Sequence, residues 1–448
     1  MLPPLISELY QRVLGRGPAG AQRFHAELLR RGIAPTPNPA RFEHNLYAPN
    51  PVLVDGAVIQ AMTADANHFC AALRADLGPP AALLARVPAH LRDHYASEEL
   101  AAQLTASLLQ AHPLICLDAF LVETERGLEP AYLEWQTVGT YVTMGQLAVE
   151  AAAAAWPELA EHSPLTATAG LAPAALAARL RELYAAGIED DPRQGVVIDY
   201  RPHQCPTRRE FQAIQDLTGG PGAGMGVIDP RELLLDGDRF AYRRDGRIIP
   251  IRRAYSRLVY SDLLALERET DAGRLALIRR FFQEGERISW ISHPIHFFYG
   301  SKADFPAFWQ AGLSPRIPET RMVTAEFIAG EARELAGGGR LRGFVQKPCD
   351  AQSGRDVVLD PALDELRPGC LLQREIRPAA CHLTLHGPRT PEVRIMAVPD
   401  AGGELIAGLI YNRIKLPEEF LSNAGRLAQR NEAGTGEGYG IVIYGPNV

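Results

Sequence analysis

The spacing of apolar and polar residues changes along the chain and predicts three regions. Residues 1–193 carry mostly helical patterns, interrupted by apolar runs over 113–123 and 131–136 that are typical of strands. Residues 194–300 alternate short apolar runs with amphipathic helices, which favours an α/β domain with a largely parallel sheet. Within residues 301–448, five segments alternate apolar and polar side chains as half-exposed antiparallel strands do: 342–347, 357–359, 370–376, 391–399 and 405–414.

Two local signals add detail to this pattern. Thr207 and Glu210 have the three-residue spacing of a capping box, which predicts a helix over 207–217. The segment 431–440 has glycine at every second position from 434, including Gly436 and Gly438, and predicts a loop that could close over a ligand. The alternative interpretation of this segment is a flexible tail.

Composition restricts the class of protein. A chain of 448 residues that is 46% hydrophobic and 22% charged is typical of a soluble protein of two or three domains. Its 46 basic and 53 acidic residues give a net charge of −7, which argues against partners such as nucleic acid or an anionic membrane. No apolar run reaches the roughly 18 residues of a membrane span, and the start lacks the pattern of a signal peptide. The six cysteines are scattered, so we expect a cytoplasmic protein with reduced thiols.

The distribution of positive charge is the most informative feature of the composition. Of the 46 basic residues only three are lysine, namely Lys302, Lys347 and Lys415. Arginine therefore serves almost everywhere a solvated positive charge suffices. We expect the three lysines at places that need a compact ammonium on a flexible stem rather than a planar guanidinium.

Lys347 ends a predicted strand and is followed by a polar loop. The loop contains Asp350 and Gly354, and a second short strand comes after it. A lysine beside such a loop can hold and cover phosphates, and a carboxylate is a ligand that Mg²⁺ prefers. The alternative is an ordinary hairpin with an exposed lysine.

Pairs of polar residues two positions apart lie on one face of several predicted strands. Glu134 and Gln136 could share a cation, and Gln373 and Glu375 could contact the edge of a purine. Glu392 and Arg394 share one strand face, and Arg413 with Lys415 suits a terminal carboxylate or a phosphate. For each pair the alternative is a half-exposed strand face with solvated side chains.

Taken in order, these segments resemble the ATP-grasp ligases. The resemblance is greatest to the circularly permuted branch that includes eukaryotic-type glutathione synthetase and related bacterial carboxylate–amine ligases. It covers roughly residues 110–440 and rests on Glu134-x-Gln136, Gly300-Ser301-Lys302, Lys347-Pro348 and Arg413-x-Lys415. The fold it implies is α/β and α+β. Two α+β subdomains in 301–448 would sandwich ATP, 194–300 would form a parallel-sheet substrate domain, and the helical N-terminal region, 1–193, would supply the metal-binding strand.

The resemblance also implies roles for individual residues. Magnesium, as two ions, would be held by Glu134, Gln136 and Asp350. ATP would be bound by Lys302, Lys347, Gln373, Glu375, Lys415, Gly354, Gly436 and Gly438. Substrate would contact Arg257, Arg413 and Tyr141, and the catalytic arginines would be Arg257, Arg394 and Arg413. The implied partners are a small-molecule carboxylate and an amine, for example an amino acid or a short peptide, and the branch also contains homodimers.

The implied activity is an ADP-forming ligation of a carboxylate to an amine through an acyl phosphate. The chain departs from glutathione synthetase in three places. Gln136 replaces an asparagine, Asp350 replaces a glutamate one residue further on, and no arginine precedes Asp118 at the position of Cys116. These departures predict a substrate other than γ-glutamylcysteine. Two alternatives stay open, a nucleotide-binding protein without ligase activity and a small-molecule kinase.

Overall fold

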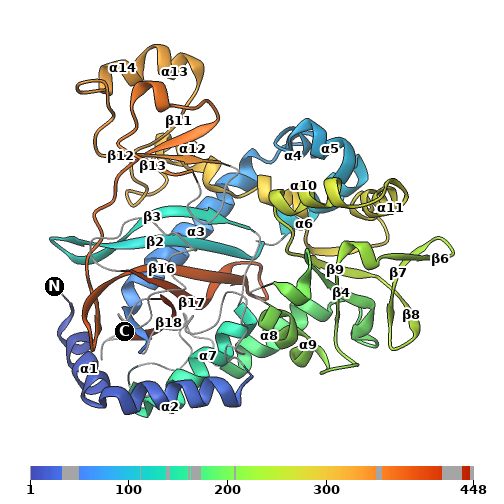
Figure 1. Cartoon of the computed structure of the whole chain (residues 1–448), viewed down its shortest axis with the longest axis horizontal. Helices are drawn as coiled ribbons and strands as arrows, with labels where there is room; N and C mark the ends of the chain where they lie inside the picture. Colours follow the sequence, from blue (N-terminus) through green and yellow to red (C-terminus); the bar gives the residue numbers. More distant parts are fainter. Residues whose placement is uncertain are drawn as a thin grey trace.

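The fold is mixed α/β, with several sheets surrounded by helices (Figure 1). The computed structural model describes residues 2–32, 50–110, 113–137, 142–159, 162, 173–205, 208–349, 356–415 and 436–443. At 173, 408–412, 415 and 436–443 it describes the backbone alone. Among the helices in these ranges, none combines the length and the apolar character that crossing a bilayer requires.

The largest sheet in the described part of the chain draws its strands from the first and the last predicted regions. Neighbouring strands are antiparallel except for β1 and β18, which run parallel. The order is β1 (Val52–Asp55), β18 (Gly436–Ile443), β17 (Leu405–Lys415), β16 (Gly387–Pro399), β2 (Ile115–Thr124) and β3 (Gly127–Gln136), with β15 (His382–Thr384) paired to β16.

The two faces of this sheet differ in chemistry because successive residues of a strand point to opposite sides. Leu117 and Ile395 belong to the apolar core on the face covered by α3 (Gly56–Asp76). The alternate positions place Asp118, Glu392 and Arg394 on the opposite face. We call this opposite face the site face.

A smaller antiparallel sheet lies beside β3 with its own apolar core (Figure 1). The Tyr132 N–H donates to Arg316 O over 2.9 Å, and Gln136 forms a bridge with Ser301, so this lobe borders the edge of the large sheet. Its elements are η6 (Lys302–Asp304), α12 (Phe305–Gln310), β11 (Thr320–Met322), α13 (Ala325–Ala329), α14 (Glu331–Leu335), β12 (Phe344–Pro348), β13 (Val358–Leu359), η7 (Leu363–Glu365) and β14 (Cys370–Arg374).

The α/β region contains the parallel sheet that the alternation of strands and helices predicts. Its order is β10 (Ser289–Ser292), β9 (Arg253–Ser256), β4 (Gly195–Ile198) and β5 (Gly226–Ile228), and every pair is parallel. The chain runs from β4 to β5 and then returns to the other side of β4, and ligands bind at such a reversal, beyond the carboxyl ends of the strands. Around it lie η3 (Pro202–Gln204), α9 (Arg208–Thr218), η4 (Pro230–Glu232), α10 (Tyr260–Glu269), α11 (Ala272–Phe282), η5 (Pro294–Phe298) and the hairpin strands β6 (Leu234–Asp236), β7 (Arg239–Arg244) and β8 (Arg247–Pro250).

The remaining helices pack partly around the large sheet and partly against the α/β region, where α5 contacts α11 and η2 contacts β8. Tyr10 of the first helix accepts a hydrogen bond from Leu53 N and bonds His382 Nδ1, both over 2.9 Å, which fixes this helix to β1 and β15. These helices are α1 (Pro4–Gly15), α2 (Gly17–Arg30), α4 (Pro80–Ala85), α5 (Ala89–Tyr95), α6 (Glu98–Gln110), α7 (Val142–Ala155), η1 (Pro157–Leu159), α8 (Pro173–Ala185) and η2 (Pro192–Gln194).

The predicted secondary structure is right for most strands and wrong at two places in the large sheet. The five predicted carboxyl-terminal strands correspond to β12, β13, β14, β16 and β17. The loop expected at Gly436 and Gly438 is instead part of β18, because the backbone there pairs with β17, and the same strand goes on to pair with β1 from Gly440. β1 itself lies in a stretch with a helical pattern, and only this long-range pairing makes it a strand.

Candidate functional site

The site face gathers acidic and basic side chains that lie far apart in the sequence. In the register of the sheet, Arg394 lies opposite Asp118, which lies opposite Glu134. In the next row, Glu392 lies opposite Arg413. Because each of these residues occupies an alternate strand position, all five project from one face.

Asp118 and Arg394 form a fully buried ion pair. Arg394 Nε and Nη2 donate to the two carboxylate oxygens of Asp118, each over 2.5 Å, and Arg394 is only 3% exposed. Burial raises the pKa of Asp118 to about 6, against the opposing charge of Arg394. Arg394 Nη2 also lies 4.0 Å from Glu134 Oε1, so one guanidinium serves two carboxylates.

Glu134 is the electrostatic centre of the site. Burial by itself raises its pKa, but the net shift is downward because nearby cations outweigh burial. The charges that lower it are those of Lys302, Arg394, Arg413 and Lys347. The positive charges of four basic residues, each singled out from the sequence, therefore act on a carboxylate that is ionised at neutral pH, and Lys302 and Arg394 lie within 4.0 Å of it.

Lys302 reaches Glu134 from the smaller lobe. Its Nζ lies 3.7 Å from Glu134 Oε2. The preceding Ser301 begins a helical turn, with its hydroxyl accepting from the Ala303 N–H, and its carbonyl accepts from the Trp135 indole over 2.7 Å. Lys302 thus opens a helical turn, and Trp135 of β3 fixes this turn opposite Glu134.

Lys347 lies on β12 and contacts both lobes. Its Nζ donates to Gln373 Oε1 over 2.7 Å and to Leu133 O over 3.4 Å. Gln373 Nε2 in turn donates to Thr320 Oγ1 over 3.1 Å and to Tyr132 O over 3.4 Å. Both the oxygen and the nitrogen of the Gln373 side-chain amide therefore form hydrogen bonds within the protein.

The other predicted nucleotide residues are placed less fully. Glu375 follows β14, its N–H donates to Gly343 O over 2.8 Å, and its side chain is half-buried. Lys415, Gly436 and Gly438 are described by backbone only, in β17 and β18. Asp350, Gly354 and Tyr141 lie outside the described residues.

Oxygen donors for a metal ion are few on this face. Glu134 and Gln136 lie two positions apart on β3, and the amide of Gln136 is hydrogen-bonded to the thiol of Cys116. Within the described ranges, no three His, Cys, Asp or Glu side chains come together as a metal cluster. This donor set fits Mg²⁺ bound together with a polyphosphate, because such sites use one or two carboxylates and take their other ligands from phosphate and water.

Arg257 lies apart from the cations around Glu134. It follows β9 at the carboxyl edge of the parallel sheet, its N–H donates to Ile198 O over 2.9 Å, and its guanidinium lies 5.1 Å from the Phe211 ring centre. Burial raises the pKa of Asp199 to about 6, and the charge of Arg257 opposes this rise. Arg257 also lowers the pKa of Cys116, although burial dominates and raises it to about 11. The region around Cys116 and Gln136 therefore connects this edge to the site face.

Glu210 caps the start of α7, a contact that the sequence pattern did not predict. Its carboxylate accepts from Met144 N over 2.6 Å and from Thr143 N over 3.1 Å, at the start of α7. The capping box expected within its own helix would have used this carboxylate locally, and Thr207 lies outside the described residues. Glu210 instead joins the parallel-sheet region to the helix that follows the strand of Glu134.

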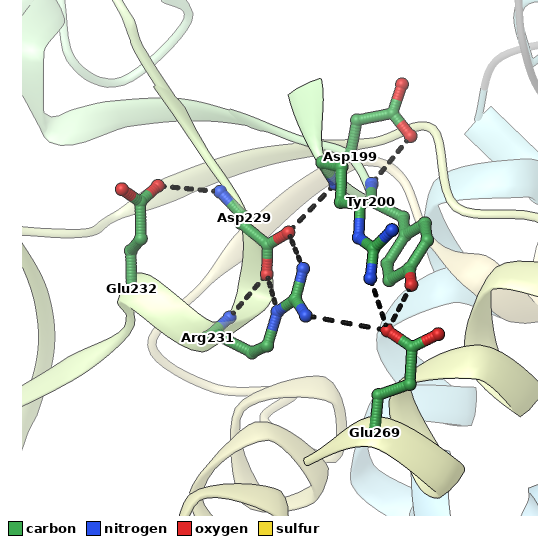
Figure 2. Close-up of polar contacts among 7 residues, drawn as sticks. Asp199, Tyr200, Asp229, Arg231, Glu232 and Glu269 are labelled. Atoms are coloured by element: carbon green, nitrogen blue, oxygen red, sulfur yellow. Dashed lines mark hydrogen bonds and ion pairs between the residues drawn. The ribbon is translucent and has the colours of Figure 1, made fainter. Parts of the chain in front are cut away.

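A polar cluster at the carboxyl ends of β4 and β5 was also missed (Figure 2). Glu269 accepts from the Tyr200 hydroxyl and from Arg201 Nη2, while Arg231 donates to both carboxylate oxygens of Asp229. The guanidiniums of Arg201 and Arg231 lie 5.0 and 5.2 Å from the Tyr200 ring centre. Both Asp199 and Asp229 directly follow buried strands, and this sequence signal could have located the cluster. This polar cluster stabilises the turn that follows β4, next to Asp199.

Comparison with known proteins gives a likeness in structure alone. No protein-family model and no curated protein matches the chain in sequence. Forty-one chains of solved structures resemble it. One is the apo structure of a glutathione synthetase-like effector from Globodera pallida. Its TM-score is 0.54 at 11% identity, over 99% of this chain and 100% of that chain. At this identity the likeness shows a shared fold of the glutathione synthetase-like type.

Proposed function

We propose that the protein is an ATP-dependent carboxylate–amine ligase that forms an amide bond and releases ADP and phosphate. The observation that carries the proposal is the convergence of Lys302, Lys347, Arg394 and Arg413 on the ionised Glu134. A concentration of positive charge around a partly buried carboxylate suits a polyphosphate with its metal ion. The glutathione synthetase-like fold supports the same class of reaction.

In this proposal ATP lies between the site face and the smaller lobe, which is the ATP-grasp arrangement. Lys302, Lys347 and Lys415 would neutralise phosphate charge, and Gln373 and Glu375 would lie at the adenine end. Glu134, Gln136 and Asp350 would hold Mg²⁺, which supplies charge neutralisation between the phosphates. Since Gly436 and Gly438 lie in a strand, they are not part of a closing loop.

The chemistry proposed is transfer of the γ-phosphoryl group of ATP to a substrate carboxylate, followed by attack of an amine and loss of phosphate. The protein would supply charge and orientation rather than a nucleophile. Arg257 and Arg413 would bind the carboxylate. Arg394, held in a fork by Asp118, would position Glu134 and steady the developing charge.

The test measures ADP release with ATP and Mg²⁺ across a matrix of amino acids, short peptides, other carboxylic acids and amines, with mass spectrometry of products. A ligase releases ADP only with both an acid and an amine, and its product is lighter than their sum by one water. Lys347→Met should lose at least about a hundredfold in rate. Arg126→Met, which removes an exposed cation from the β2–β3 turn, should not. An unchanged rate in Lys347→Met would refute the assignment of this lysine.

A second candidate is a nucleotide-binding protein without ligase activity. The altered pair of metal-binding positions favours it, since glutamine stands two positions after Glu134 on β3. ATP binding with no substrate-dependent ADP release would support this candidate. A stable phosphorylated product without an amide would instead identify a kinase.

A further inference from the structure

Thr390 carries a buried hydroxyl whose hydrogen bond is missing. It lies on β16 and is 0% exposed, and its Oγ1 has no hydrogen-bond partner among the residues that the structure describes. Burial of a hydroxyl without a partner is unfavourable, so native proteins retain few such groups. Two other buried threonines are satisfied, since Thr63 donates to Ile59 O and Thr384 donates to Gly387 O.

The position of Thr390 points to a ligand rather than to a packing defect. Thr390, Glu392 and Arg394 are alternate residues of β16, so all three belong to the site face. In the register of β16 with β17, Thr390 lies opposite Lys415, and Glu392 lies opposite Arg413. Residues directly opposite one another in an antiparallel pair are close enough to contact the same bound group.

The chemistry of these neighbours defines what the hydroxyl would meet. Arg413 and Lys415 are two positions apart on β17, and Arg413 Nη1 donates to Glu392 Oε1 over 2.9 Å. Basic residue types at these register positions favour an anionic oxygen. A threonine hydroxyl can donate its proton to such an oxygen. We propose that Thr390 Oγ1 donates a hydrogen bond to an anionic oxygen of the ligand on the site face. This inference rests on the proposed function. The anionic oxygen would belong either to a nucleotide phosphate or to the substrate carboxylate.

The chain offers a matched control for this residue. Thr105, on α6, is also buried with its Oγ1 unpartnered among the described residues, but it lies outside the site face. Replacing either threonine by valine keeps the shape of the side chain and removes the hydroxyl. Thr390→Ser removes a methyl group and keeps the hydroxyl.

The experiment measures Tm without nucleotide and, by calorimetry with Mg²⁺, the affinities for ATP, ADP and adenosine. Thr390→Val is expected to keep or raise Tm and to weaken ATP and ADP binding about tenfold. Adenosine binding should not change, Thr105→Val should leave all three affinities unchanged, and Thr390→Ser should retain most of the ATP affinity. If ATP affinity is unchanged and the KM for the carboxylate rises about tenfold, the anionic oxygen belongs to the substrate.

Two results would overturn this inference without affecting the proposed function. One is a marked fall in Tm for Thr390→Val, because it would mean that the hydroxyl has a partner within the protein. The other is ATP binding by the wild-type protein together with unchanged affinities and KM in Thr390→Val. Failure of the wild-type protein to bind ATP would instead overturn the nucleotide proposal, and this inference with it.

Discussion

Replacing Arg394 by methionine should destabilise the protein strongly, because it leaves the buried carboxylate of Asp118 without its counter-charge. Methionine has a similar length but offers no hydrogen bond and no charge. In the native protein the guanidinium makes two 2.5 Å hydrogen bonds to Asp118 and lies 4.0 Å from Glu134. Removal of one partner from a buried pair typically costs about 3–5 kcal/mol. At 4.0 Å and an effective dielectric of about 20, the attraction to Glu134 alone is about 4 kcal/mol.

The expected loss is about 3–5 kcal/mol in the free energy of unfolding at pH 7.5. Lys302 remains beside Glu134 in the variant, so most of the loss should come from Asp118. Equilibrium unfolding in urea, followed by tryptophan fluorescence, would measure it. Hydrogen exchange of the β16 peptide would show whether the opening is local.

The loss should depend on pH in a defined direction. Burial raises the pKa of Asp118 to about 6 in the wild-type protein, and removal of Arg394 should raise it further. A carboxyl group whose pKa is raised by folding stabilises below its unfolded pKa and loses that contribution as pH rises through its folded value. The difference between wild type and Arg394→Met should therefore be largest above pH 6 and should shrink toward pH 5.

A second substitution separates this explanation from simple loss of packing. Asp118→Asn removes the uncompensated charge, so the double variant should be more stable than Arg394→Met alone. If the two substitutions instead destabilise additively, the two residues are not coupled. A loss below about 1 kcal/mol for Arg394→Met at pH 7.5 would also refute the reasoning.

The other predictions concern Lys302 and His382. Lys302→Met should bind Mn²⁺ without nucleotide more tightly than wild type, because the cation 3.7 Å from Glu134 is gone. Electron paramagnetic resonance would measure this, and equal affinity in Lys302→Met and Lys302→Arg would contradict it. Burial lowers the pKa of His382, which bonds Tyr10, to about 3. Because the unfolded chain binds that proton near pH 6.5, stability should fall as pH drops from 7 to 5. This fall in stability with pH should be shallower in His382→Asn than in the wild-type protein. If Tm depends on pH identically in the two proteins, the prediction is wrong.

Residue patterns predicted the parts of the fold that depend on local periodicity. Alternation placed β16 and β17, and short apolar runs between helices placed the parallel sheet. Patterns could not identify β1, because four apolar-rich residues become a strand only by pairing with β18, nearly 400 positions later, as Val52 does with Gly440. They also could not assign Glu210 to the start of α7, since either helix could use that carboxylate and tertiary packing decides.

The candidate site shows the same limit. Spacing identified Glu134, Arg394 and Arg413 as polar positions on strands, and the scarcity of lysine identified Lys302 and Lys347. No local pattern could pair Arg394 with Asp118, which is 276 positions away. Strand order and register create that pair, and with it the separation of the charged face from the apolar face covered by α3.

The contacts of the lysines and arginines on the site face explain why lysine survives there. Arg394 and Arg413 hold carboxylates at 2.5 and 2.9 Å, and such planar, directed pairs fix geometry. Lys302 lies 3.7 Å from its carboxylate, and Lys347 donates to a neutral amide and a backbone carbonyl. Under the proposed function, a phosphate would compete with these contacts, and the flexible stem would let the ammonium follow it. Arg394 would then hold Asp118 and Glu134 in place, while the lysines would move onto the nucleotide.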